Sequence, residues 1–384
     1  MAQNNSLLWQ AAPHTIAKIE ILKGYLNAWF PIVGSKFKKL VYIDGFAGPG
    51  SYENHPEGSP LAALDVFNSW ITKKPERIVV EDISCFFIES DRNTLDYLAE
   101  KLSQMSLAKR IHPKPCHGDF ETVFGELIQM PSIADNVTGA LPLLIFADPF
   151  GGTGVPFHLF QRCLESQGSE LLLNFDADGI ARIHFGKNPG WEKQLNEVFG
   201  CDEWQTALEP HNDSLARKSE KALALYKQKL LAIDGVKFVW SFEMRGKTDR
   251  LNYYLVFASR NRLGMEKMKE AMRSIDGSGN YCFSDAYRDH HILFKNDDAE
   301  FFAKIMHEKY LGQNVTYADL DIYALCETPF INPKGMLDWL SRSHLIRVQA
   351  KPGCAPRAHS FPEEQIDYVT FLNPPKREVQ RELF

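Results

Sequence analysis

Acidic residues that end apolar segments are the positions where this sequence could bind a ligand. Residues 40–43 form a short apolar run of the kind found in buried parallel strands, and Asp44 follows it directly. The loop after Asp44 contains Gly45, Gly48 and Gly50. Such a loop lets backbone N–H groups approach a nucleotide-like ligand, with the N-terminus of the next helix behind it. The acid suits a cationic or hydroxyl-bearing group. Alternatively, the glycines only connect a strand to a helix.

Glu89, Asp119 and Asp148 end later segments in the same manner. Glu89 follows the apolar run 85–88, where a carboxylate can accept both hydroxyls of a ribose. The alternative is that the acids here, including Asp91, only begin a helix. Asp119 ends a weaker strand that starts near residue 110, and it could equally cap the following helix.

The elements that would position these acids alternate between strands and helices. An amphipathic helix is expected from Thr15 to about Phe30, with His14 and Lys18 on one side of its first turn. The strands expected after it lie at residues 40–43, 85–88, 110–120, 141–147, 171–175, 237–242 and 251–259. Alternation of this kind predicts an α/β fold with a mostly parallel sheet covered by helices on both faces. The last two strands flank a turn and form an antiparallel hairpin.

The length, net charge and composition of the chain limit the classes of protein to which it can belong. A length of 384 residues allows two or three domains, and a net charge of −6 means that any nucleic-acid binding needs a local basic patch. Residues 1–10 lack the pattern of a signal peptide, and no apolar run approaches the roughly 20 residues of a membrane span. Seven dispersed cysteines without a C-x-x-C pair favour reduced thiols in the cytoplasm over a disulfide framework or zinc site. We therefore expect a cytoplasmic protein with no membrane segment.

The pattern D-x-F-x-G-x-G at residues 44–50 resembles the first motif of class I S-adenosylmethionine (SAM) methyltransferases. The resemblance implies a Rossmann-like fold with a seven-stranded, mostly parallel sheet, and SAM as the cofactor. It places Asp44 near the amino group of SAM, with the glycines under its ribose and methionine part. It also implies that Asp119 meets the adenine amine and that Phe120 packs against the adenine ring. Phe46, within the motif, is counted with the cofactor-binding residues.

Asp148, Pro149 and Phe150 resemble the catalytic motif of amino-group methyltransferases, whose usual form is [DNS]-P-P-[YFW]. In that family the carboxylate and the proline carbonyl accept the two N–H bonds of an exocyclic amine, and the aromatic ring stacks on the base. This sequence has one proline and an aromatic residue one place early. The alternative is a structural strand end.

Three segments together resemble the three-Cys-motif partner protein family, which is methyltransferase-like. They are H-T-x-x-K at residues 14–18, Y-I-D-G-F-A-G-P-G at 42–50 and G-S-P-L-A-A-L at 58–64. The resemblance implies a partner protein that carries three cysteines. Lys18 would meet the carboxylate of SAM, although a solvated lysine is the alternative. Ser59 is counted with the cofactor-binding residues, and it is also a good helix N-cap.

The C-terminal part has a different character. We expect a SAM-binding domain at residues 1–262 with a helical insertion at 180–233, a helical linker at 263–310, and a winged-helix-like domain at 311–384. The last domain carries a local basic surface, which favours DNA or RNA phosphates. Its residues are Arg342, Arg347, Lys351 and Arg357. A winged helix that binds protein is the alternative.

The sequence therefore predicts methyl transfer from SAM to an exocyclic base amine of DNA or RNA, with a three-cysteine-motif partner protein. A second hypothesis is a non-catalytic subunit that binds nucleic acid or the partner on a methyltransferase fold. A third is a nuclease that uses Asp176 and Asp178 with a metal ion, although their spacing fits no calcium or zinc loop and we expect no metal site.

Overall fold

The computed structural model describes residues 7–130, 133, 141–149, 155–166, 168–185, 190–209, 213–276, 280–286 and 298–373. The chain divides into two compact units. The first comprises Met1–Gly277 with Tyr281–His291, and the second comprises Ser278–Asn280 with Ile292–Phe384.

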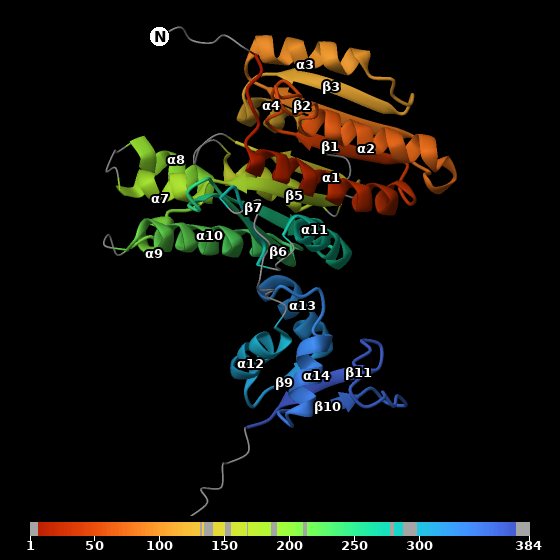
Figure 1. The fold of residues 1–384 in the computed structure, drawn as a ribbon, viewed down its shortest axis with the longest axis vertical. Coiled ribbons are helices and arrows are strands. Elements are labelled where there is room, and N and C mark those ends of the chain that lie inside the picture. The colour runs from red at the N-terminus through yellow and green to blue at the C-terminus, as the bar shows by residue number, and fades with distance from the viewer. Residues whose placement is uncertain are drawn as a thin grey trace, which may run out of the picture. The chain divides into compact units, whose positions relative to one another are not determined.

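The first unit is built on one eight-stranded sheet (Figure 1). Its strands run in the spatial order β3-β2-β1-β4-β5-β7-β6-β8. Their bounds are β1 (Lys39–Asp44), β2 (Asp82–Glu89), β3 (Ile111–His117), β4 (Leu143–Ala147), β5 (Ser169–Phe175), β6 (Phe238–Arg245), β7 (Leu251–Ser259) and β8 (Cys282–Ser284).

Strand β7 alone runs antiparallel to the rest of this sheet. The α/β class, the mostly parallel sheet and the hairpin of β6 and β7 are thereby confirmed. The order of the first seven strands is that of the Rossmann-like class I methyltransferase fold. Strand β8 is an addition that was not predicted from the sequence.

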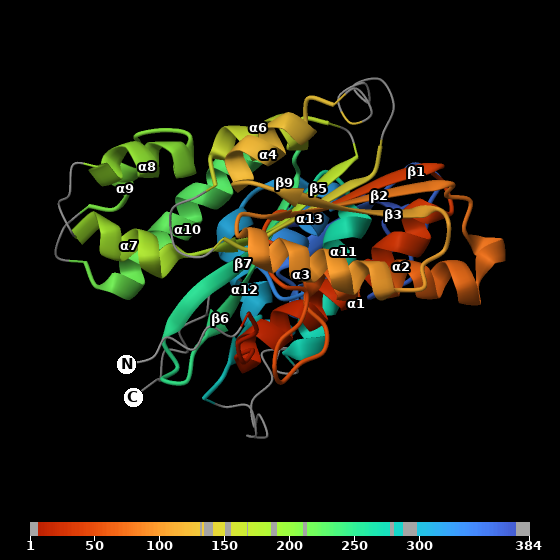
Figure 2. The same ribbon diagram turned by 90° about the horizontal axis from the view of Figure 1, so that it is seen from above.

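Helices cover both faces of the sheet. Figure 2 shows α1, α2, α3 and α11 along one face, with α4 and α6 on the other. Helix α1 contacts both α2 and α11, and α4 contacts α6. The bounds are α1 (Pro13–Gly34), α2 (Ser59–Lys73), α3 (Arg92–Gln104), α4 (Phe120–Leu127), α6 (Phe157–Leu164) and α11 (Arg262–Ile275), with a 3-10 turn at Pro75–Arg77.

The segment between β5 and β6, where the helical insertion at residues 180–233 was expected, holds four helices in its described residues. It consists of α7 (Ala177–Phe185), α8 (Gly190–Phe199), α9 (Trp204–Ala207) and α10 (Leu215–Leu231). Helix α10 packs on α7 and contacts β6 and β7. Its buried Tyr226 ring stacks on Phe175 of β5, with centroids 4.4 Å apart. The segment is therefore part of the core of the first unit.

Burial explains why these strands could be predicted from the sequence. Strands β4 and β5 are buried at every residue, and β1 at every residue after Lys39. A parallel strand with helices on both faces must be apolar on both faces, so it appears as a continuous apolar run. Asp44 stands at the end of such a run and shares its burial.

The division into units differs from the expected boundaries. Helix α11 packs on α1 and on β6 and β7, because Met265, Met268 and Met272 give it a buried apolar face. It belongs to the first unit. Helix α12 (Ala299–Tyr310) belongs to the second unit, where Ala303 and Met306 enter the core. The residues 263–310 therefore do not form a separate linker.

In its described residues, 280 and 298–373, the second unit has three helices and a three-stranded antiparallel sheet in the order β10-β11-β9. Its elements after α12 are β9 (Asn314–Thr316), α13 (Tyr317–Glu327), α14 (Lys334–Arg342), β10 (Ile346–Ala350) and β11 (Ile366–Phe371). Thr316 caps α13, because its Oγ1 accepts a hydrogen bond of 3.2 Å from the backbone N–H of Asp319.

Within the residues that the structure describes, no helix combines the length and apolar character needed to cross a membrane.

Candidate functional site

Asp44 lies at the carboxyl end of β1, beneath the glycine loop. The whole residue is buried, and its Oδ1 accepts a 3.3 Å hydrogen bond from the backbone N–H of Phe46. Oδ2 is buried without a hydrogen-bond partner. The pKa of this carboxyl is raised to about 7, chiefly by burial and to a smaller extent by the charge of Asp148, while Ser59, the backbone of Phe46 and Lys18 act in the opposite direction. A buried acceptor of this kind is costly unless a donor reaches it.

Glu89 ends the neighbouring strand and contacts the same loop. One carboxylate oxygen accepts a 3.0 Å hydrogen bond from the backbone N–H of Gly48. The other accepts one of 2.8 Å from the N–H of Asp91, the N-cap of α3. Glu89 is half-buried, so its carboxylate borders the loop and still faces outward. This is the position expected of a residue that accepts hydroxyl groups.

The loop needs its glycines for two separate reasons. Gly48 and Gly50 have φ of +58° and +76°, a backbone region that side chains disfavour. Gly45 is required for space, because a Cβ there would lie 2.4 Å from a ring carbon of Phe120. A Cβ on Gly58, at the far end of the loop, would lie 2.8 Å from the Gly50 carbonyl carbon.

Gly45→Ala is expected to destabilise the first unit by about 1–3 kcal/mol, because the added methyl group must displace the Phe120 ring. Thermal unfolding would measure the loss. Gly335→Ala, in helix α14, is the matched control. The new Cβ would lie 3.6 Å from the Cβ of Ala299, an ordinary contact distance, and alanine favours the helix more than glycine does. An equal loss in both variants would contradict the packing argument.

Lys18, Asp148 and Asn174 form a hydrogen-bonded chain at the carboxyl ends of β4 and β5. The ammonium of Lys18 donates to Oδ2 of Asp148. Asn174 donates its amide N–H to Oδ1 of the same carboxylate at 2.6 Å. The Lys18 side chain is 7% exposed and that of Asp148 is 18% exposed, so the pair is largely shielded from water. The structure thus pairs Lys18 with Asp148, whereas the sequence analysis expected it to meet a ligand carboxylate.

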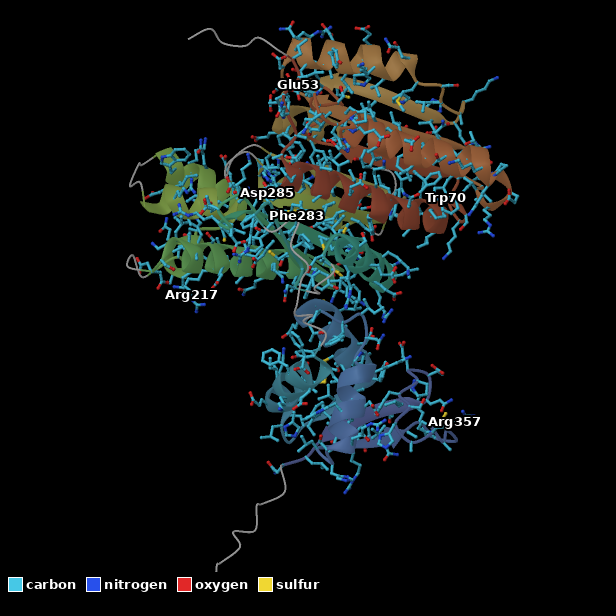
Figure 3. All side chains as sticks on the ribbon, viewed as in Figure 1. Glu53, Trp70, Arg217, Phe283, Asp285 and Arg357 are labelled. Carbon is cyan, nitrogen blue, oxygen red and sulfur yellow. The ribbon has the colours of Figure 1, made fainter. Side chains whose placement is uncertain are left out.

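His14 and Asp285 form a second pair that sequence reasoning missed. His14 Nδ1 and Asp285 Oδ2 are 2.7 Å apart, although the residues are far apart in the chain. Figure 3 labels Asp285 in the first unit, next to Phe283 of β8. The Tyr253 ring lies near both His14 and Lys18: its centroid is 5.8 Å from the centroid of the His14 ring and 5.3 Å from Lys18 Nζ. The shared helical face of His14 and Lys18 was the available signal. Nothing in the sequence indicated Tyr253 or Asp285.

The cluster contains further buried oxygens. The Tyr253 hydroxyl, Asp285 Oδ1 and Asn174 Oδ1 are buried without hydrogen-bond partners. Burial raises the pKa of the Tyr253 phenol, and the charges of Asp148 and Asp285 raise it further. Polar groups from α1, β4, β5, β7 and β8 therefore meet at one edge of the sheet. A His–Asp pair here could accept a proton, and the oxygens could accept hydrogen bonds.

Asp119 and Phe120, which were predicted to bind the cofactor, have structural roles. Asp119 caps α4 with Oδ1, which accepts a 2.9 Å hydrogen bond from the N–H of Thr122. Phe120 is only 5% exposed, and its ring stacks on Phe46 and Phe124 at centroid distances of 5.1 and 4.7 Å. Phe120 is thus a core residue, and Phe46, half-buried, is the more accessible ring. The contacts of Asp119 and Phe120 with adenine stay predictions.

Pro149 is buried, and Phe150 lies outside the described residues. Asp176 accepts a 2.7 Å hydrogen bond from the N–H of Gly179, and Asp178 pairs with Arg182 at 2.5 Å. In the part of the chain that the structure describes, no group of three or more His, Cys, Asp or Glu side chains could hold a metal ion.

Two cavities lie at the opposite edge of the sheet. One of about 220 Å³ is lined by Ser169, Glu170 and Ser259, and another of about 390 Å³ by Leu141 and Leu143. Both are at the amino ends of β4 and β5. Because ligands of open parallel sheets bind outside the carboxyl ends of the strands, the chemistry of Asp44 and Asp148 defines the candidate site better than cavity size does.

Comparisons with known proteins give only distant similarities. No protein-family model matches the sequence, and no curated protein does either. Among solved structures, the O-methyltransferase TomG of Streptomyces achromogenes, in complex with SAM, is similar with a TM-score of 0.34 and 12% identity, over 62% of this chain and 78% of that one. A loganic acid methyltransferase with SAH gives a TM-score of 0.30 and 10% identity over 75% and 88%. MNMC2 of Aquifex aeolicus gives 0.28 and 11% over 54% and 76%. The assignment of the fold rests on the strand order and not on these similarities.

Proposed function

We propose that this protein is a SAM-dependent methyltransferase whose cofactor binds against the glycine loop and Glu89. The observation that carries the proposal is the buried, unpartnered Oδ2 of Asp44 at the carboxyl end of β1. In a sheet with this strand order, that position faces the ligand. A donor from the ligand would relieve the cost of burying this oxygen.

The charges around the loop suit a cationic ligand. Asp44, Asp148, Asp285 and Glu89 bring four carboxyl groups to this edge, where Lys18 pairs with Asp148 and His14 with Asp285. SAM carries an ammonium group and a sulfonium ion, and when bound it supplies an activated methyl group. The negatively charged carboxylates at this site therefore complement the two positive groups of SAM.

Each residue then has a physical role toward the ligand. Asp44 accepts a hydrogen bond from the ligand's ammonium group, and Glu89 accepts the ribose hydroxyls. Asp148 is held in place by Lys18 and Asn174, so it presents a fixed carboxylate to the acceptor. We propose an exocyclic base amine of DNA or RNA as that acceptor, with a three-cysteine-motif protein as partner.

Calorimetric titration of the full chain with SAM tests the cofactor. We expect micromolar binding, lost in the double variant Asp44→Ala, Glu89→Ala. A folded parent protein that does not bind SAM would remove the enzyme hypothesis for the isolated chain.

A second candidate function is favoured by the engagement of Asp148. Both of its oxygens already accept hydrogen bonds, from Lys18 and Asn174, which leaves less capacity for the N–H groups of a substrate amine. The chain would then be a non-catalytic subunit on a methyltransferase fold. SAM binding without methyl transfer to DNA or RNA, in the presence of the partner, would favour this candidate.

The second unit supports the nucleic-acid part of the proposal. Its elements follow the order helix, strand, helix, helix and hairpin, which is the order of a winged helix. Arg347, Lys351 and Arg357 are exposed on β10 and on the loop that joins it to β11, where Figure 3 labels Arg357. Arg342 pairs with Asp338 at 2.9 Å, so it adds less net charge to this surface.

Replacing Arg347, Lys351 and Arg357 together with alanine is expected to weaken binding to duplex DNA and to lower the slope of log K against log salt by up to about 3. Fluorescence anisotropy between 50 and 200 mM salt would measure it. The matched control replaces Arg92, Lys193 and Arg217, which are exposed on helices of the first unit. An equal change in the control would show that only net charge matters.

A further inference from the structure

The segment that precedes α1 is attached to the loop that follows the glycines. The backbone N–H of Glu53 donates to the carbonyl of Trp9 at 3.1 Å. The N–H of Ala11 donates to Oδ1 of Asn54 at 2.7 Å, and the Asn54 amide donates back to the Ala11 carbonyl at 3.0 Å. Three hydrogen bonds therefore hold residues 9–11 against residues 53–54.

This attachment places the indole of Trp9 over the glycine loop. A Cβ added to Gly48 would lie 3.9 Å from Cη2 of Trp9, with no other heavy atom of the described residues as close as 4 Å apart from its chain neighbours. The ring also meets the edge of the Tyr52 ring, with centroids 5.8 Å apart and planes at 79°. Trp9 is nevertheless 43% exposed, which is a large accessible area for an aromatic side chain.

Tyr52, the second ring of this pair, lies near the buried carboxyl groups of the site. Burial raises the pKa of its phenol, and the charges of Asp148 and Asp44 raise it further. These charges act on Tyr52 only because the carboxylates lie near it. Trp9 and Tyr52 therefore belong to the surroundings of the candidate site, on the outer side of the loop.

We propose that Trp9 is a ligand-contacting residue, whose indole forms the outer wall of the site above Gly48 and packs on the nucleoside part of the ligand. This inference rests on the proposed function. The N–H of Gly48 donates to Glu89, so a ribose bound to Glu89 lies beside Gly48. Cη2 of Trp9 would be in ordinary contact with a Cβ on Gly48, so the indole lies against this side of the loop. Contact between an aromatic side chain and a nucleoside is favourable and tolerates many geometries.

The test measures SAM binding by calorimetry in the full chain and its Trp9→Ala and Trp9→Phe variants. We expect Trp9→Ala to bind SAM about 10-fold more weakly, with Trp9→Phe between it and the parent. The matched control is Trp70→Ala. Trp70 is also partly exposed, but it donates its indole N–H to Asn27 on α1, and Figure 3 shows it well away from Glu53.

Tryptophan fluorescence gives an independent reading. SAM should change the emission of the parent and of Trp70→Ala, and this change should be absent from Trp9→Phe. Parent-like affinity in Trp9→Ala, together with a retained fluorescence change in Trp9→Phe, would overturn the role of Trp9 and leave the proposed function standing. Failure of the parent to bind SAM would overturn the proposed function and this inference with it.

Discussion

Asp148→Ala is expected to lower the free energy of unfolding of the first unit by about 3–5 kcal/mol. The cost arises because Lys18 would keep a charged ammonium in a position where its side chain is only 7% exposed, without the carboxylate that now accepts from it. The amide of Asn174 would lose its acceptor at the same time. Urea unfolding monitored by circular dichroism would measure the loss.

The double variant Lys18→Met, Asp148→Leu separates this cause from simple loss of packing. When both members of a shielded pair are replaced by apolar groups, no buried charge is left unpaired, so the double variant should be more stable than Asp148→Ala. A double variant that is destabilised by the sum of the two single losses would show that the ion pair is not the source. Asp148 would then be sensitive for reasons of local packing.

Asp44→Asn is expected to weaken SAM binding by about 10- to 100-fold, because a hydrogen bond to a charged acceptor is replaced by one to a neutral amide. In the parent, affinity should rise between pH 6 and 7.5, because the pKa of Asp44 is about 7 and the charged form binds the cation. Titration calorimetry at several pH values would show this rise in the parent and a flatter profile in the variant. A parent-like profile in Asp44→Asn would assign the pH dependence to another group.

The same carboxyl affects stability in the absence of ligand. Its pKa is about 7 in the folded protein and 3.8 as the ordinary value, so the folded state binds more protons between these two values. Stability from this group is therefore full below about pH 4 and is lost as the pH rises toward 7. The change corresponds to about 4 kcal/mol, and the difference between the parent and Asp44→Asn isolates it from other groups.

Much of the first unit could be predicted because its central strands β1, β4 and β5 are buried on both faces. Continuous apolar runs such as residues 40–43 and 171–175 mark β1 and β5, and the acids that follow them mark the carboxyl edge of the sheet. Gly48 and Gly50 likewise reflect a local backbone demand, a positive φ, that a sequence displays directly.

The contacts within the site could not be predicted in the same way, because they join distant segments. Lys18 pairs with Asp148, and His14 with Asp285, through packing of α1 across the sheet. The expected helix start at Thr15 was also wrong: α1 begins at Pro13, with Ala12 as its N-cap, since proline favours the first turn. Strand β8 is only three residues long and half-buried, too short for its pattern to stand out.

Helix α1 also fixes when the first unit can fold during synthesis. Lys18 contacts Asp148 near one edge of the sheet, and the Tyr25 hydroxyl donates to Glu170 near the other. Glu170 in turn accepts a 2.6 Å hydrogen bond from Ser259, at the end of β7. Helix α1 therefore leaves the ribosome well before β7 and waits for its partners to be complete, roughly ten seconds or more at 5–20 residues per second. During that interval α1 lacks its contacts with α11 and the contact of Tyr25 with Phe257 of β7, so part of its apolar surface stays exposed.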